Sequence, residues 1–289
     1  MKAGLHQIRR RNSTKLSVLT VNYRTSDFIE NMLYCLHRIT YYPFKVLIAD
    51  NFYSHEEKLR LNNICQTYNN VDIFYRNQSQ SGSMGHGEAL DILAKKVDTP
   101  YFAILDADAT FLIRNWDRIL ISELDSNCKV IGTQAQLNQK RKPIDFPLMF
   151  AILFETQAFR DLDIQFKPPS RAEALKGRDT GYQLREKYKA ANKTGKLLYH
   201  IYSIKKKDSP FHGIACTEYK LDGYDQIIAS HFWRGASSVM SENISQDNRL
   251  FIKVRKTPVL GGRLITMIRK MQKKKWLRQC KKIVDEQFI

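Results

Sequence analysis

The sequence predicts an α/β fold, with a mostly parallel, Rossmann-like sheet flanked by helices and a basic helical tail at the C-terminus. Apolar, β-branched runs alternate with helical patterns through the first 110 residues, which is typical of a parallel sheet covered on both faces. Hydrophobic residues make up 43% of the 289 residues and aromatic residues 11%, enough for a packed core. Lys and Arg gather at the two chain ends, outside this pattern.

The first half reads as four strands joined by helices. Apolar runs predict the strands at 16–23, 44–50, 71–77 and 101–108. Helical patterns lie between them at 26–39, from the polar loop after residue 50 to about 68, and at 88–97. Ser26 is the expected N-cap of the first helix, and a Ser/Gly-rich loop precedes the third. Ligands bind such sheets at the carboxyl ends of the strands, where four polar residues fall: Asp50, Asn77, Asp106 and Asp108.

The second half is less regular. KVIGTQA (129–135) and KLLYHIYSI (196–204) predict strands. The apolar segment 147–162 fits either a helix or a strand followed by a turn. A loop and then a helix beginning near Asp179 are expected between 167 and 195.

The net charge of +18 lies mainly at the chain ends. Residues 1–15 carry five Lys and Arg and no acid, and residues 250–289 carry twelve against two acids, which leaves +3 for 16–249. A nucleic-acid groove would place charge inside the fold, so we expect no specific nucleic-acid partner. The basic ends suit an anionic membrane surface better.

Five scattered cysteines without a CxxC pair predict reduced thiols in a cytoplasmic protein and no zinc site. No apolar stretch reaches the length needed to cross a bilayer, and the N-terminal residues lack the apolar centre of a signal peptide.

The motif Asp106-Ala107-Asp108 carries the main chemical signal. Residues i and i+2 of a strand-like segment point to the same side, so both carboxylates could approach one hard cation such as Mg²⁺ or Mn²⁺. Such an ion would neutralise the charge on a departing diphosphate. A second D-x-D, Asp161-Leu162-Asp163, has no strand before it and serves as an internal control.

Four motifs together resemble the family-2 glycosyltransferases of the GT-A fold, most closely their bacterial rhamnosyltransferase-like branch: TVNY (20–23), IADN (48–51), N-x-x-x-x-G (77–82) and ILDADAT (104–110). The resemblance implies a GT-A type nucleotide-diphospho-sugar transferase fold and a sugar nucleotide as donor. It also implies a catalytic domain over 16–250, with a nucleotide-binding half (16–115) and an acceptor-binding half (116–250). A basic extension (1–15) and a basic amphipathic tail (251–289) flank it.

The resemblance also implies site residues. Asn22 and Tyr23 would line the nucleotide site, and Asp50 would contact the base. Asp106 and Asp108 would hold ribose, metal and diphosphate. The nucleotide-binding set expected in full is Asn22, Tyr23, Arg24, Asp50, Asn51, Gly82, His86, Asp106 and Arg234. The segment GHGEALD (85–91) departs from the family pattern, which bears on the donor sugar because this region borders the sugar pocket.

SHFWRGASS (230–238) resembles a late family segment whose histidine completes the metal or diphosphate site, which makes His231 the third expected metal ligand. The alternative is a core histidine with a satisfied hydrogen bond. Arg234 would pair with phosphate through its planar donor fork.

GRDTGYQLR (177–185) resembles the family's acidic motif at a helix start, so Asp179 is the expected general base. An ordinary helix N-cap is the alternative, with Glu155 or Asp161 as the next candidates for the base. One carboxylate that deprotonates the attacking hydroxyl implies inversion at the anomeric carbon, without an enzyme nucleophile.

Two other functions fit parts of the sequence. ILDADAT also satisfies the motif of HAD-type phosphatases, with Asp222 and Asp225 as a poor acidic pair, but three β-α units upstream count against it. A non-catalytic adaptor at anionic membranes is the other alternative.

The tail 263–284 places Leu264, Ile268 and Met271, and then Trp276, Cys280 and Ile283, at helical spacing among many Lys and Arg. Such a helix could lie in a bilayer interface with its apolar side down, or pack on the catalytic body. The expected enzyme thus acts on a glycan or lipid-linked acceptor in cell-surface polysaccharide synthesis, peripheral on the inner membrane face. Truncation before Gly261 is expected to leave nucleotide binding intact.

Overall fold

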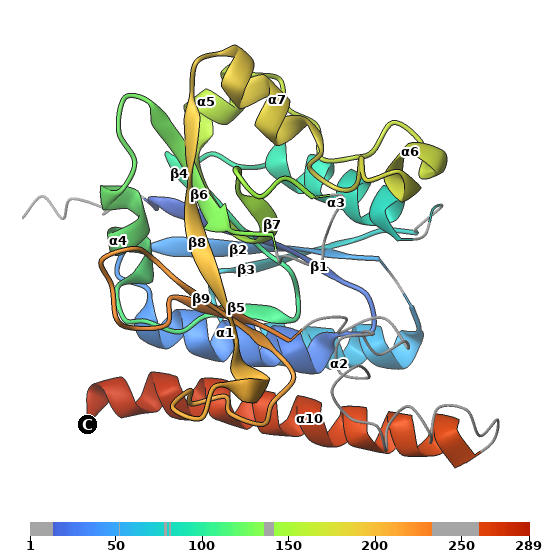
Figure 1. Cartoon of the computed structure of the whole chain (residues 1–289). Coiled ribbons are helices and arrows are strands. Elements are labelled where there is room, and N and C mark those ends of the chain that lie inside the picture. Colours follow the sequence, from blue (N-terminus) through green and yellow to red (C-terminus); the bar gives the residue numbers. More distant parts are fainter. Residues whose placement is uncertain (1–13, 52, 78–79, 81, 136–141, 233–259) are drawn as a thin grey trace, which may run out of the picture.

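A computed structural model describes residues 14–51, 53–77, 80, 82–135, 142–232 and 260–289, and its strands form one ten-stranded sheet (Figure 1). In sheet order the strands are β3 (Val71–Tyr75), β2 (Phe44–Asp50), β1 (Leu16–Asn22), β4 (Tyr101–Leu105), β7 (Leu148–Glu155), β6 (Cys128–Thr133), β8 (Thr194–Tyr202), β9 (Thr217–Lys220), β10 (Ala229–His231) and β5 (Ala109–Phe111).

The first half of the sheet is parallel, as the alternating pattern predicts: β1 pairs with β2 and β4, and β2 with β3. Every side chain of β1 is buried, because helices cover both faces of the sheet. The carboxyl ends of these four strands therefore meet at one edge. Strand β4 ends at Leu105, three residues before the predicted end, because the chain turns at 106–108.

The helices form two layers with a separate core on each face of the sheet. Phe28 of α1 and Trp276 of α10 belong to one core, and Leu90 of α3 and Tyr188 of α7 to the other. The helix bounds are α1 (Ser26–Ile39), α2 (His55–Cys65), α3 (Ser83–Ala94), α4 (Trp116–Ser122), α5 (Thr156–Asp161), α6 (Arg171–Leu175), α7 (Gln183–Ala190) and α10 (Leu260–Asp285).

Two helix starts differ from their predicted positions. Thr25, not Ser26, is the N-cap of α1, and the Ser26 hydroxyl instead donates to Glu57 Oε1 at 2.5 Å. Helix α3 begins at Ser83, five residues before the predicted start, and takes in Gly85 and Gly87. A Cβ at Gly87 would lie 2.6 Å from the Lys167 Cα, so close packing against another backbone explains a glycine that local propensity would keep out of a helix.

The second half of the sheet contains antiparallel pairs. The segment 147–162 is a strand followed by a short helix, β7 and α5, and β7 runs antiparallel between β4 and β6. Strands β8, β9, β10 and β5 then pair antiparallel in that order. Because β5 follows β4 in the chain but lies at the far end of this group, residues 106–108 join the two halves of the sheet.

Helix α10 lies along α1 on the outside of the molecule (Figure 1). The side chains of Trp276, Cys280 and Val284 are fully buried in the same core as α1. Trp276 and Cys280 of the predicted apolar side therefore pack on the catalytic body, as in the alternative, whereas Met271 of that side is exposed. Membrane association of the tail stays a prediction. Within the described residues, no helix combines the length and apolar character required to span a membrane.

Candidate functional site

Three predicted metal ligands come together where the two halves of the sheet join. Asp106 and Asp108 occupy the turn between β4 and β5, and His231 is the last residue of β10. The two aspartates are therefore not on a strand, which corrects the predicted reason for their proximity. Backbone hydrogen bonds fix the turn instead: Asp106 N donates to Phe150 O, and Phe232 N to Asp108 O, both at 2.9 Å.

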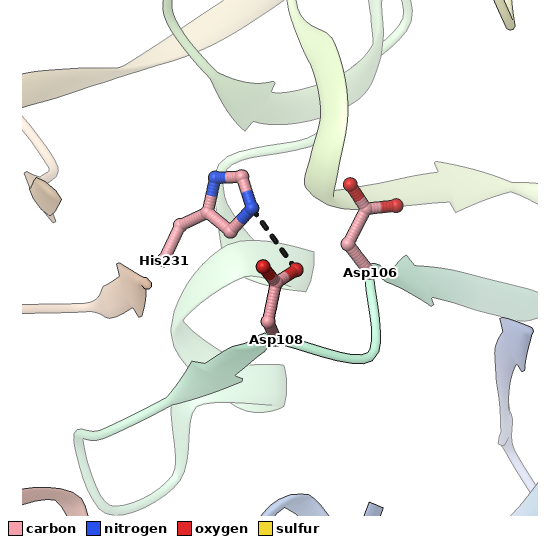
Figure 2. A group of neighbouring side chains, drawn as sticks. All are labelled: Asp106, Asp108 and His231. Carbon is pink, nitrogen blue, oxygen red and sulfur yellow. Dashed lines mark hydrogen bonds and ion pairs between the residues drawn. The ribbon is translucent and has the colours of Figure 1, made fainter. Parts of the chain in front are cut away.

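One ligand atom from each of Asp106, Asp108 and His231 lies within 4.8 Å of the others. Figure 2 shows both carboxylates on the same side of the turn, with the imidazole facing Asp108. His231 Nε2 is 3.2 Å from Asp108 Oδ1, and the ring stacks on Phe150 at a centroid distance of 4.6 Å. The predicted alternative, a core histidine, accounts for the burial of His231 but not for its two acidic neighbours, Asp106 and Asp108.

These side chains fit a hard divalent cation. Two carboxylates and a neutral imidazole are suitable ligands, and a nucleotide's phosphate oxygens could complete the shell. Asp106 Oδ1 is buried and accepts no hydrogen bond from the described residues, although His86 Nε2 lies 3.6 Å away. Such an atom is costly to bury unless a ligand satisfies it.

The electrostatics of the cluster follow from its burial. Burial raises the pKa of Asp106 to about 6, against the opposing effect of the His86 and His231 rings. Burial by itself lowers the pKa of His231, but the adjacent Asp108 carboxylate outweighs it, so the pKa is raised. Both shifts follow from the burial of the three groups in one compact site.

Beside the cluster, the ends of β1 and β2 form a buried polar pair. Asn22 Nδ2 donates to Asp50 Oδ1 at 2.9 Å, and Asn22 Oδ1 accepts from the Thr25 hydroxyl at 2.8 Å. Burial raises the pKa of Asp50, although the Asn22 amide opposes it. The structure brings these two predicted residues into direct contact at the carboxyl edge.

Two aromatic rings border this pair. Tyr23 meets Tyr53 edge-to-face at 5.6 Å, and the Arg24 guanidinium lies 4.2 Å above the Tyr53 ring. Arg24 holds φ at 62°, a left-handed conformation that a side chain adopts only when its surroundings enforce it. Tyr53 was not predicted, since only its tertiary contacts reveal it.

A third group links β2, β3 and α3 through Arg76. Its guanidinium donates to Asn51 Oδ1 at 3.0 Å, to Gly85 O at 3.1 Å and to Glu88 at 2.6 Å. Arg76 directly follows β3, so the strand-end signal that identified Asp50 could have found it. The predicted Asn77, one residue later, is exposed.

The start of α3 brings Gly82 and His86 to the site. Gly82 is the N-cap with φ 63° and ψ −143°, a backbone conformation essentially limited to glycine. His86, one turn into the helix, reaches the Asp106 carboxylate.

Asp179 lies in the turn before α7, three residues ahead of the Tyr182 N-cap, so both its predicted place at the helix start and the N-cap alternative are wrong. Its Oδ2 accepts from Lys142 Nζ at 2.9 Å, and its neighbour Thr180 donates to Ser83 O at 3.3 Å. Burial acts to raise the pKa of Asp179, but Lys142 and Ser83 outweigh it and the pKa is lowered. Asp179 also raises the pKa of Asp106, which places it within electrostatic reach of the cluster.

A cavity of about 750 Å³ opens beside Asp179. Lys142, Met149 and Thr180 line it, together with parts of the segments 143–148 and 176–186. Lys142 and this cavity were not predicted.

Several predicted residues lie elsewhere. Glu155 is opposite Tyr101, at the amino end of β4 and thus at the far edge of the sheet, and Asp161 follows it in α5. Asp222 and Asp225 are exposed between β9 and β10. Arg234 lies outside the described residues.

The sequence profile described as glycosyl transferase family 2 matches residues 17–178. No curated protein matches the chain. Among solved structures, a Pyrobaculum calidifontis mannosyltransferase, PcManGT, in complex with GDP-Man and Mn²⁺, is 12% identical with a TM-score of 0.50, and the match covers 63% of this chain and 53% of that one. This likeness shows the fold.

Two further structures are similar. TarS of Staphylococcus aureus is 15% identical with a TM-score of 0.47, over 64% of this chain and 58% of that one. Glucosyl-3-phosphoglycerate synthase of Mycobacterium tuberculosis, solved with Mn²⁺, UDP and phosphoglyceric acid, is 11% identical with a TM-score of 0.48, over 65% of this chain and 69% of that one. The chain thus spans little more than half of the mannosyltransferase and of TarS.

Proposed function

We propose that this chain, which belongs to glycosyl transferase family 2, transfers a sugar with inversion from a nucleoside diphosphate donor to a glycan or lipid-linked acceptor. We propose cell-surface polysaccharide synthesis as the process. The observation that carries the proposal is the cluster of Asp106, Asp108 and His231 beside the Asn22–Asp50 pair, all at the carboxyl edge of the sheet.

We assign the donor diphosphate and a divalent metal, Mn²⁺ or Mg²⁺, to the cluster. Such a metal neutralises charge on the leaving diphosphate when it is bound. Mannosyltransferase PcManGT, which shares the fold, was solved with GDP-Man and Mn²⁺, and the same classes of ligand suit the donor atoms here. His86 and Gly82 stand on the diphosphate side at the start of α3, where free backbone N–H groups favour an anion.

We assign the nucleoside to the ends of β1 and β2. Asp50 is buried and held by Asn22, so its remaining carboxylate oxygen is oriented to accept from an N–H of the base. Tyr23 and Tyr53 supply the aromatic surface beside it, and Arg24 lies over Tyr53. Asn51, which directly follows Asp50, is held by a hydrogen bond from Arg76.

We assign the role of general base to Asp179. Its carboxylate removes the proton of the acceptor hydroxyl as that oxygen bonds to the anomeric carbon and the bond to the diphosphate breaks on the opposite face. Lys142 keeps the carboxylate ionised, as a base requires. The adjoining cavity, lined by Lys142 and Thr180, is where we expect the acceptor to bind.

The two alternative functions, a phosphatase and a non-catalytic adaptor, have less support. In the phosphatase hypothesis the second acidic pair would approach the motif, but Asp222 and Asp225 are exposed in a separate turn. Membership of an enzyme family disfavours the adaptor. All five cysteines are buried free thiols, which supports a reducing, cytoplasmic location.

The two D-x-D motifs provide a matched test. Thermal shifts with UDP, GDP, dTDP and CMP, each with Mn²⁺, should reveal one preferred nucleotide whose binding EDTA abolishes. Asp108→Ala should remove the Mn²⁺-dependent shift and reduce transfer by about 10³-fold or more. Asp163→Ala, in the motif far from the cluster, should leave both unchanged. Full activity of Asp108→Ala, or equal losses in the two variants, would overturn the assignment.

A further inference from the structure

Helix α10 has one side that the catalytic domain does not use. Its inner side is occupied: Trp276 contacts Phe28 and Phe232, and the Trp276 indole N–H donates to Ser230 Oγ at 2.9 Å. Lys273 pairs with Asp27, and Asp285 with Arg38. The opposite side points away from α1 (Figure 1).

That opposite side, the outer face of α10, is made of cations and two methionines. Spacings of three and four residues put its members on one stripe. Each is exposed, and Met267 and Met271 keep 63% and 45% of their surface. Its members are Met267, Lys270, Met271, Lys274, Lys275, Arg278 and Lys282.

Four of the five cations of this face are not neutralised locally. The sequence contains no acid between residues 260 and 284. In the described part of the chain, Lys270, Lys274, Lys275 and Arg278 form no ion pair or hydrogen bond, while Lys282 lies 3.6 Å from Glu286. Like charges this close repel one another, so an extended anionic partner would relieve their repulsion.

We propose that the outer face of α10 binds an anionic lipid surface. The five cations lie on one side of a single helix over residues 270–282, about 18 Å at 1.5 Å per residue, so a flat surface can meet them together. Binding is electrostatic adsorption, because Trp276, Cys280 and Val284 are buried in the core and, among the described side chains of the outer face, the apolar ones are Met267 and Met271. It should therefore weaken steeply with salt.

Lipid suits this face better than nucleic acid. Nucleic-acid surfaces interleave cations with exposed aromatic rings or form a groove along the strand. The described outer face is convex, contains no aromatic ring and carries methionines, which can enter a headgroup layer. The proposal concerns location, so it is independent of the assigned donor and acceptor sites.

Two charge-matched triple variants of the full chain test it. The first is Lys270→Gln, Lys274→Gln and Lys275→Gln on the outer face. The second is Arg60→Gln, Lys95→Gln and Arg171→Gln, three exposed cations on α2, after α3 and on α6. Both lower the net charge equally, and both should keep the melting temperature because exposed substitutions change stability little.

The measurement is co-sedimentation with vesicles of equimolar phosphatidylglycerol and phosphatidylcholine, against pure phosphatidylcholine. Each cation near an anionic surface corresponds to about a fivefold change in partitioning, so the outer-face variant should bind about a hundredfold more weakly. The control variant should bind like the unmodified protein, and neutral vesicles should bind none of them.

Three results would overturn the proposal: equal losses in both variants, no loss in the outer-face variant, or equal binding to neutral and anionic vesicles. Single-stranded RNA serves as a competing polyanion. If the outer-face variant lost RNA binding but kept vesicle binding, nucleic acid would be the partner of this face instead.

Discussion

The proposed donor and acceptor sides of the candidate site are built in different ways. On the donor side, Asn22 and Asp50 end regular parallel strands, are almost fully buried and hold each other by a hydrogen bond. On the acceptor side, Asp179 and Lys142 belong to loops, remain partly exposed and meet as an ion pair. The donor side is thus fixed by the sheet itself, whereas the acceptor side depends on loop packing. Mutations should therefore separate into effects on nucleotide affinity and effects on turnover.

The largest effect should come from removing helix α10, which packs on the core shared with α1. Truncation before Gly261 deletes Trp276, Cys280 and Val284, so it should unfold the domain rather than leave nucleotide binding intact. Trp276→Ala alone should lower the free energy of unfolding by about 3–5 kcal/mol, measured by urea denaturation. Met271→Ala, exposed on the same helix, should cost less than about 0.5 kcal/mol. Comparable values for the two would show that α10 does not support the core.

Asp179→Asn should come next and distinguishes the two sides most directly. An amide cannot accept the acceptor's proton, so kcat should fall by roughly 10²-fold or more while nucleotide affinity holds. Asp50→Asn is the donor-side counterpart and should instead weaken nucleotide binding. A fall in nucleotide affinity without loss of turnover per bound donor would make Asp179 structural.

His231→Ala tests the metal cluster, which lies where the two halves of the sheet join. Loss of one of three ligands should weaken Mn²⁺-dependent nucleotide binding about 10- to 100-fold, by titration calorimetry, with little change in acceptor KM. A lowered melting temperature with unchanged nucleotide affinity would assign His231 to the core.

The smallest effect is expected from Lys142→Met. Without the ammonium, less of the effect of burial is offset and the pKa of Asp179 rises, so more of the base is protonated at a given pH. The acid limb of the kcat/KM profile should move to higher pH, with full activity recovered above it. Lys142→Arg should restore the original limb, and an unshifted limb in Lys142→Met would detach this pair from catalysis.

The donor side could be predicted from the sequence because strand ends are visible in it. Apolar runs bounded by polar residues located Asp50 and Asp106, since periodicity records burial along regular strands, whereas Asn22 was expected from the family resemblance. The segment 147–162 was left open because a short apolar run suits a helix or a strand equally.

The acceptor side was harder to predict because its contacts are tertiary. Lys142 and Asp179 are 37 residues apart, and no local pattern connects them. The tail was predicted as a helix correctly, but periodicity alone cannot tell whether its apolar side meets a bilayer or a protein core. Trp276 decides this point through its contacts with α1 and β10.

The position of the turn 106–108 also links ligand binding to folding. Asp106 continues from a strand of the parallel half, whereas Asp108 and His231 belong to the antiparallel half, so a cation held by all three would act as a clip between them. A ligand that binds only the folded chain at 100 times its Kd adds about 2.7 kcal/mol to stability. Donor occupancy would then determine resistance to heat and proteolysis as well as turnover, and a cell short of sugar nucleotide would hold the enzyme in its most fragile state.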